Sequence, residues 1–212
     1  IGASVVRAWK VVSLPFQPEY IGDRIWNRFA PQYKVPRKEN RDNLSYPTWQ
    51  KMLNHRGAGL DQGVKDSSWC RANGILTGGD YLKVWVASLL QEPTKPLPYL
   101  FFYGPQNSGK TTFYEAIELL VTRGVTRAHL ALTSEGGFNA EIRDAILCVV
   151  EELDLRTGKS AYNRIKDWVT ARTICIHEKR ETPYTVDNHT HWIQCANDRD
   201  FCPVFPGDTR IT

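Results

Sequence analysis

The sequence lacks the features that mark membrane, secreted and disulfide-rich proteins. No apolar run approaches the ~20 residues that a transmembrane helix needs, and no basic stretch before an apolar core marks a secretion signal. The five cysteines show no paired C-x-x-C spacing, which disfavours both a disulfide framework and a zinc site. We therefore expect an intracellular protein with reduced thiols and no membrane partner. The first residue is not Met, and we expect a fragment of a longer protein.

The composition that remains is that of an ordinary globular protein. Hydrophobic residues make up 42% and charged residues 24% of the 212 residues, so the chain is able to bury a core and is not disordered. The net charge of +4 allows a polyanionic partner but does not establish one. The function therefore has to be inferred from motifs.

The chain divides near residue 78 into two regions that differ in composition and in the regularity of their predicted elements. Residues 1–78 carry much of the proline and aromatic content, and we interpret them as a smaller N-terminal accessory or oligomerisation region. In this region we predict a short helix over Ile21–Phe29. A second helix is predicted to be capped by Ser45, to begin around Pro47 and to end near Gly57.

Residues 79–212 alternate predicted helices and strands. Asp80 is predicted to cap a helix with apolar residues on one face, and a further helix is expected between Ser160 and Thr170. Apolar strands are predicted over Tyr99–Tyr103, Ala128–Leu132, Ile146–Val150 and Trp192–Ala196. Strands that alternate with helices predict an α/β fold with a parallel sheet flanked by helices.

A phosphate-binding pattern begins directly after the strand Tyr99–Tyr103. The run Gly104-x-x-x-x-Gly109-Lys110-Thr111 matches the P-loop pattern at every position. The glycines let backbone N–H groups point at phosphates, and the start of the following helix adds its positive end. We expect Lys110 to reach the β- and γ-phosphates of ATP and Thr111 to bind Mg²⁺. The predicted ATP-binding residues are Gly104, Pro105, Gln106, Asn107, Ser108, Gly109, Lys110, Thr111 and Thr112.

Polar side chains that suit ATP hydrolysis follow two other predicted strands. The strand Ile146–Val150 runs into Glu151 and Glu152. In P-loop ATPases an acid at this position holds Mg²⁺ and a neighbouring glutamate polarises the attacking water. We assign the metal to Glu151 and the water to Glu152, although the two roles are exchangeable at this point. Asn197 ends the strand Trp192–Ala196; it is either a hydrogen-bond donor to the γ-phosphate or attacking water, or a turn residue.

In this order the motifs resemble those of the superfamily 3 helicases of small DNA viruses, phages and plasmids. They look most like the helicase halves of poxvirus-type and phage primase-helicases. The resemblance rests on Gly-Pro-Gln-Asn-Ser-Gly-Lys-Thr, on the strand that closes in Glu151-Glu152 and on the strand that ends in Asn197, and it covers about residues 80–212. It implies an AAA+ ATPase core that acts as a homo-hexameric ring and moves along single-stranded DNA during DNA replication.

The resemblance also implies roles and surroundings that the residues alone do not fix. Asn197 would be the sensor residue, and Arg210 in Gly-Asp-Thr-Arg would act on the nucleotide of the adjacent subunit; an ordinary surface arginine is the alternative. Thr209 stands where the family often has a second arginine. A primase or polymerase domain would precede the fragment in the longer chain. The compartment would be the host cytoplasm or nucleus for a viral protein, and the cytoplasm for a phage or bacterial one.

A predicted hairpin lies between the two catalytic strands, where the family places a hairpin that lines the pore of the ring. Arg172–His177 and Tyr184–Asp187 alternate apolar and polar residues, and a charged turn joins them. Lys179 and Arg180 at its tip would contact DNA phosphates in a manner that is independent of sequence and sensitive to salt. The alternative is a solvated turn, because Glu178 and Glu181 flank the two bases.

Two other functions remain open at this stage. One is a P-loop kinase that acts on a small molecule, although no arginine-rich lid follows the carboxylates. The other is a nucleotide-binding module that hydrolyses little ATP and holds a replication complex together. Because the chain stops shortly after Arg210, we also expect that the ATPase domain is truncated at its C-terminus.

Overall fold

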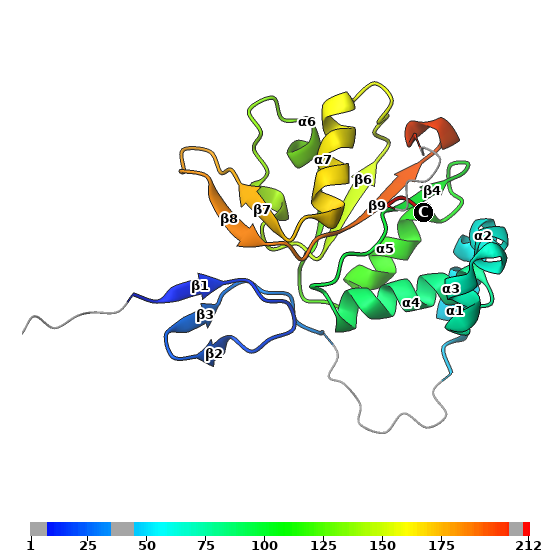
Figure 1. Cartoon of the computed structure of the whole chain (residues 1–212), viewed down its shortest axis with the longest axis horizontal. Coiled ribbons are helices and arrows are strands. Elements are labelled where there is room, and N and C mark those ends of the chain that lie inside the picture. Colours follow the sequence, from blue (N-terminus) through cyan, green and yellow to red (C-terminus); the bar gives the residue numbers. More distant parts are fainter. Residues whose placement is uncertain (1–7, 35–44, 204–209) are drawn as a thin grey trace, which may run out of the picture.

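The structure, a computed structural model, describes residues 8–34, 45–203 and 210–212 (Figure 1). Its main feature is a parallel four-stranded sheet in the order β4-β9-β6-β5. These strands are β4 (Leu100–Tyr103), β5 (Val125–Arg127), β6 (Leu147–Glu151) and β9 (His191–Ala196). Ile211 pairs with Tyr99 in the parallel direction, so the end of the chain runs along the outer edge of β4. The predicted α/β fold with a parallel sheet is confirmed.

Helices cover both faces of this sheet (Figure 1). One face carries α4 (Gly78–Gln91) and α5 (Lys110–Glu118), and the other carries α6 (His129–Thr133) and α7 (Lys159–Thr170). Along β6, Leu147 and Val149 pack toward α4 and α5, whereas Cys148 and Val150 pack toward α6 and α7. A strand that is buried on both faces requires an unbroken apolar run. Such a run shows no alternation of apolar and polar residues, so its composition, and not its periodicity, predicts the strand.

Three N-terminal helices pack beside α4. They are α1 (Pro47–Gly57), α2 (Asp61–Asp66) and α3 (Ser68–Ala72). Leu53 of α1 joins the same buried cluster as Leu82 of α4. The two helices touch backbone to backbone, since a Cβ on Gly78 would lie 1.8 Å from the carbonyl oxygen of Gly57. Residues from the predicted accessory region thus contribute directly to the core under the sheet.

The first part of the chain forms a small separate sheet. Its strands are β1 (Lys10–Val12), β2 (Tyr20–Gly22) and β3 (Ile25–Asn27), in the order β1-β3-β2. The predicted helix over Ile21–Phe29 is therefore wrong. Arg24 has a φ of 56° and turns the chain back, so that β2 and β3 pair antiparallel. The segment after β3 joins the main body, because Lys34 N–H donates to the carbonyl of Leu120 at 2.9 Å.

Other sequence predictions also need correction. The strand predicted over Ala128–Leu132 is wrong, because this segment is the N-cap and most of α6, and the strand β5 ends just before it at Arg127. Ala128, Ala131 and Leu132 are buried while Leu130 is 62% exposed, which is the i, i+3, i+4 spacing of a helix. The helix that ends at Gly57 is confirmed, but Tyr46 rather than Ser45 is its N-cap residue.

The cap of α4 is a second case in which the predicted helix is confirmed but the predicted N-cap residue, here Asp80, is wrong. Thr77 is the N-cap residue, and its side chain accepts from the N–H of Asp80. Asp80 completes the capping box by accepting from the N–H of Thr77 at 3.0 Å. The predicted helix between Ser160 and Thr170 is confirmed as α7.

The predicted hairpin is confirmed as β7 (Thr173–Ile176) and β8 (Tyr184–Asp187), which pair antiparallel. Ile174 and Ile176 anchor it in the core on the α7 side of the main sheet. All five cysteines are free thiols. Across the described residues, no helix combines the length and the apolar character that crossing a bilayer requires.

Candidate nucleotide-binding site

The glycine-rich loop of the sequence motif joins the carboxyl end of β4 to the start of α5. Gly104, Asn107 and Gly109 have φ values of 153°, 61° and 82°, which are conformations that glycine adopts without strain and asparagine tolerates. The motif thus lies in the strand–loop–helix context that the sequence predicted. The first N–H groups of α5 have no partner within the helix and are available to an anion.

The ammonium group of Lys110 is held inside this loop. Lys110 is only 7% exposed, and its Nζ donates to the carbonyl oxygens of Gly104 at 2.8 Å and Pro105 at 2.9 Å. It donates a third hydrogen bond, of 3.1 Å, to Oδ1 of Asn197 at the end of β9. The structure therefore brings Lys110 and Asn197 together, although 87 residues separate them in the sequence.

A cavity of about 650 Å³ opens on this loop. Its walls contain the loop residues from Gln106 to Thr112 together with Glu151, Glu152, Cys195 and Asn197. The Oγ atom of Ser108 is buried in the loop without a hydrogen-bond partner in the described part of the chain. Buried polar atoms without partners are uncommon in proteins, and a bound phosphate oxygen would satisfy this one. These features fit a nucleotide phosphate group with a divalent cation.

Glu151 is already engaged on one side of the cavity. Its Oε1 accepts a 2.6 Å hydrogen bond from the hydroxyl of Tyr114 on α5, and its Oε2 accepts a 3.0 Å bond from Nε of Arg127 on β5. Burial, followed by the bond to Glu151, raises the pKa of Tyr114 to about 12, so this phenol remains a donor throughout the physiological pH range. Sequence reasoning missed Tyr114 and Arg127, because the packing of α5 on the sheet places Tyr114 beside Glu151 and the pairing of β5 with β6 places Arg127 there.

Glu152 lies at the turn that leaves β6. Its φ is 50°, and its N–H donates to the carbonyl of Cys195 on the neighbouring strand. No described residue donates a hydrogen bond to its carboxylate. A glutamate held in the left-handed region stores backbone strain, which is more common at functional sites than elsewhere. The two adjacent carboxylates thus differ, because Glu151 is paired and Glu152 is not.

Arg56 on α1 is a second residue that the motifs did not reveal. A Cβ added at Gly109 would lie 3.2 Å from its Nη2 atom, so its guanidinium rests against the glycine-rich loop. Burial lowers the pKa of Arg56, and within the described residues the side chain has no hydrogen-bond or ion-pair partner. It lines a second cavity of about 900 Å³ together with Tyr103 and Pro105, and this cavity shares Ser108 with the first. An isolated arginine in a helix gives no sequence signal of such a position.

The two predicted DNA-binding residues lie at the tip of the β7–β8 hairpin. Lys179 and Arg180 are both exposed. Glu178 beside them is drawn back toward the base of the hairpin, because it accepts from Arg143 at 2.9 Å and from the hydroxyl of Tyr184 at 2.5 Å. These bonds lower the pKa of Glu178 and neutralise one of the two acids that flank the bases.

Arg210 lies apart from these residues. Its carbonyl accepts from the N–H of Tyr99, which precedes β4, whereas the glycine-rich loop begins at the opposite end of that strand. The structure therefore does not bring Arg210 to the loop of its own chain. The preceding motif residues Gly207, Asp208 and Thr209 lie outside the described residues.

Comparison with protein families gives a match over residues 102–210, which is just over half of the chain. The matching model describes a family of unknown function, DUF5906. The chain belongs to this family. The matched segment contains the glycine-rich loop, Glu151, Glu152 and Asn197, whereas Arg56 lies outside it. No curated protein matches the chain.

Solved structures give a likeness in fold. The apo structure of the NrS-1 C-terminal region (305–718) has a TM-score of 0.72 and 19% identity, and the match covers 96% of this chain and 46% of that one. The A-form apo structure of the same region has a TM-score of 0.69 and 19% identity, with 99% and 48% covered. The chain shares the fold of these structures and spans about half their length.

Proposed function

We propose that the chain is the ATPase part of a superfamily 3 replicative helicase, which moves along single-stranded DNA by hydrolysing ATP. The observation that carries the proposal is the position of Lys110. Its ammonium lies between the loop carbonyls and Asn197, and both glutamates that end β6 line the same cavity. The fold shared with the NrS-1 C-terminal region is compatible with this function.

Each residue then has a defined task at the nucleotide. Backbone N–H groups from Gly104 to Thr112 hold the phosphates, and Lys110 exchanges its loop carbonyls for phosphate oxygens. Mg²⁺ would neutralise charge on the phosphates, with Thr111 and Glu151 as its protein ligands. Glu152, which has no partner among the described residues, orients the attacking water. Asn197 donates its amide N–H to the γ-phosphate or to that water.

Arg56 adds a second cation to the site. Its guanidinium rests against Gly109 of the loop without a partner in the described structure, so its donors are free to act on a phosphate group that the loop holds. Since α1 lies outside the family match, this contact would be supplied by the N-terminal region. The proposal therefore extends the nucleotide site beyond the motif-bearing segment.

The remaining parts of the proposal concern DNA and assembly. Lys179 and Arg180 at the hairpin tip would hold DNA phosphates, and copies of the chain would form a hexameric ring with the hairpins in its pore. Arg210 would then act on the nucleotide of the adjacent copy, in agreement with its distance along β4 from the loop of its own chain.

The test is the rate of ATP hydrolysis with and without single-stranded DNA. We expect stimulation by DNA in the wild-type chain, a loss of about 100-fold or more in Lys110→Ala, and loss of the stimulation alone in Lys179→Ala/Arg180→Ala. Lys65→Ala/Lys83→Ala, which removes two exposed charges from α2 and α4, is the matched control. A hydrolysis rate that does not change when DNA is added would contradict the translocase and favour an assembly module. Stimulation by a small acceptor molecule would favour a kinase.

A further inference from the structure

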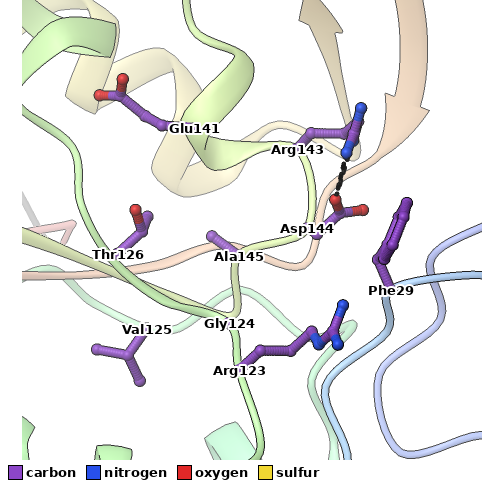
Figure 2. A pocket seen from close by; sticks show the side chains of 9 residues that line it. All are labelled: Phe29, Arg123, Gly124, Val125, Thr126, Glu141, Arg143, Asp144 and Ala145. Carbon is purple, nitrogen blue, oxygen red and sulfur yellow. Dashed lines mark hydrogen bonds and ion pairs between the residues drawn. The ribbon is translucent and has the colours of Figure 1, made fainter.

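A second polar surface lies at the opposite edge of the main sheet, where β5 and β6 begin. One cavity there, of about 370 Å³, is shown in Figure 2. A neighbouring cavity of about 510 Å³ lies between β1 and the β7–β8 hairpin, and the two share Phe29, Arg143 and Asp144 in their walls. We call the two together the amino-edge groove, defined by Lys10, Arg28, Phe29, Arg123, Arg143 and Tyr184.

Phe29 lies at the junction of the two cavities. Its side chain is 41% exposed, and its φ is 64°, which is a strained value for a bulky residue. Two guanidinium groups lie over its ring, Arg28 at 4.3 Å and Arg123 at 5.5 Å from the ring centroid. Figure 2 shows Phe29 and the guanidinium end of Arg123 on the same side of the cavity. A base that stacks on this exposed ring would replace a guanidinium group that lies over it, and the displaced cation would then bind a flanking phosphate.

The charges of the groove favour an anionic ligand. Arg143 is neutralised, because its Nη atoms lie 2.8 Å from Asp144 and 2.9 Å from Glu178. Glu141 is also engaged, since its Oε1 accepts from the N–H of Ala131. By contrast, Lys10, Arg28 and Arg123 form no ion pair with any described residue. Two carboxylates in the walls, those of Glu141 and Asp187, also form no ion pair with a described residue, so these three cations outnumber them by one.

We propose that the amino-edge groove binds single-stranded nucleic acid. A base stacks on Phe29, and Lys10, Arg28 and Arg123 bind the backbone phosphates on either side. Stacking on one ring requires an unpaired base, so a single strand fits better than a duplex. The ion pair between Arg143 and Glu178 connects the groove to the turn of the hairpin. Tyr184 of β8 also belongs to both the groove and the hairpin. The groove thus holds the strand that the hairpin tip contacts further along.

This proposal deepens the proposed function and takes from it the view that the chain works on DNA. The experiment is done without nucleotide, so that its result does not depend on whether the chain hydrolyses ATP. Binding of fluorescein-labelled dT20 to the full 212-residue chain is measured by fluorescence anisotropy over a series of salt concentrations. Circular dichroism and melting temperature confirm that each variant is folded.

Two variants and their matched controls decide the outcome. Lys10→Ala/Arg28→Ala/Arg123→Ala should reduce the slope of log K against log salt by about 2, because each single-strand phosphate contact contributes about 0.7. Lys51→Ala/Lys65→Ala/Lys83→Ala removes the same charge from the helices beside α4 and should leave the slope unchanged. Phe29→Leu should weaken dT20 binding about tenfold without weakening binding to a duplex. Trp69→Leu, which alters a tryptophan that is 58% exposed on α3, should have no such effect.

Three results would overturn the proposal. The first is a wild-type chain that does not bind dT20. The second is an equal loss in the groove variants and in their controls, which would make the effect one of overall charge. The third is a groove variant that binds dT20 normally but changes the sedimentation coefficient, which would show that the groove is a contact between copies of the chain.

Discussion

Replacing Tyr114 with phenylalanine tests which glutamate binds the metal. The change removes a 2.6 Å hydrogen bond to Glu151 and leaves the buried ring in place. Hydrogen bonds to charged groups contribute about 1.5–3 kcal/mol, and the Glu151 side chain is 37% exposed, so water replaces part of the bond. We therefore expect a loss of about 1–1.5 kcal/mol in unfolding free energy, which lowers the melting temperature by about 3–5 °C.

The same change should strengthen the binding of Mg·ATP. If Glu151 has to leave Tyr114 to reach Mg²⁺, then removing the hydroxyl lowers that cost by the same amount, and the Kd should fall about five- to tenfold. Isothermal titration calorimetry with a non-hydrolysable ATP analogue measures this. Tyr162→Phe is the control, because its hydroxyl donates to the carbonyl of Pro203 and neither residue lines the nucleotide cavity. An unchanged Kd in Tyr114→Phe would refute the reasoning and assign the metal to Glu152.

Three further predictions follow from single contacts. Arg56→Ala should weaken ATP binding about tenfold in calorimetry, with Arg56→Lys intermediate, because a lysine keeps the charge but not the planar fork of donors. Burial lowers the pKa of His189, so the unfolded chain takes up a proton first as the pH falls below about 6.5. Stability in urea should therefore decrease from pH 7.5 to 5.5, and less so in His189→Gln. Asn27→Ala removes four bonds to residues 14–18 and should increase hydrogen exchange in β1–β3 while sparing β6.

The sequence predicted the structure best at positions where a single physical requirement, such as a tight turn or burial on both faces, determines the residue type. Glycines before a lysine and a helix predicted the loop, and apolar runs followed by a glycine, by acids or by an asparagine predicted the strands β4, β6 and β9. The errors arose where neighbours in space decide the structure. Ile21–Phe29 has a mixture of apolar and polar residues that suits a helix, but the segment forms parts of two strands, because β3 pairs with both β1 and β2.

The site residues that sequence reasoning missed have the same origin. Arg56, Tyr114 and Arg127 belong to three different elements and form no local pattern. Only the packing of α1 on α4, the packing of α5 on the sheet and the pairing of β5 with β6 reveal them. Conversely, Lys110 and Asn197 were predicted separately from the ends of their strands. Their hydrogen bond follows from the pairing of β4 with β9, which aligns the two strand ends.

The backbone contact between Gly57 and Gly78 has a consequence for how inherited or engineered changes in this chain should be interpreted. Any side chain at either position would force α1 away from α4, because a Cβ at Gly57 would lie 2.2 Å from the carbonyl carbon of Gly78. Arg56 precedes Gly57 directly and would be withdrawn from the loop with it. An alanine at Gly78 would therefore produce the phenotype of a nucleotide-site lesion, even though that glycine contacts no ligand and lies outside the family's matched segment.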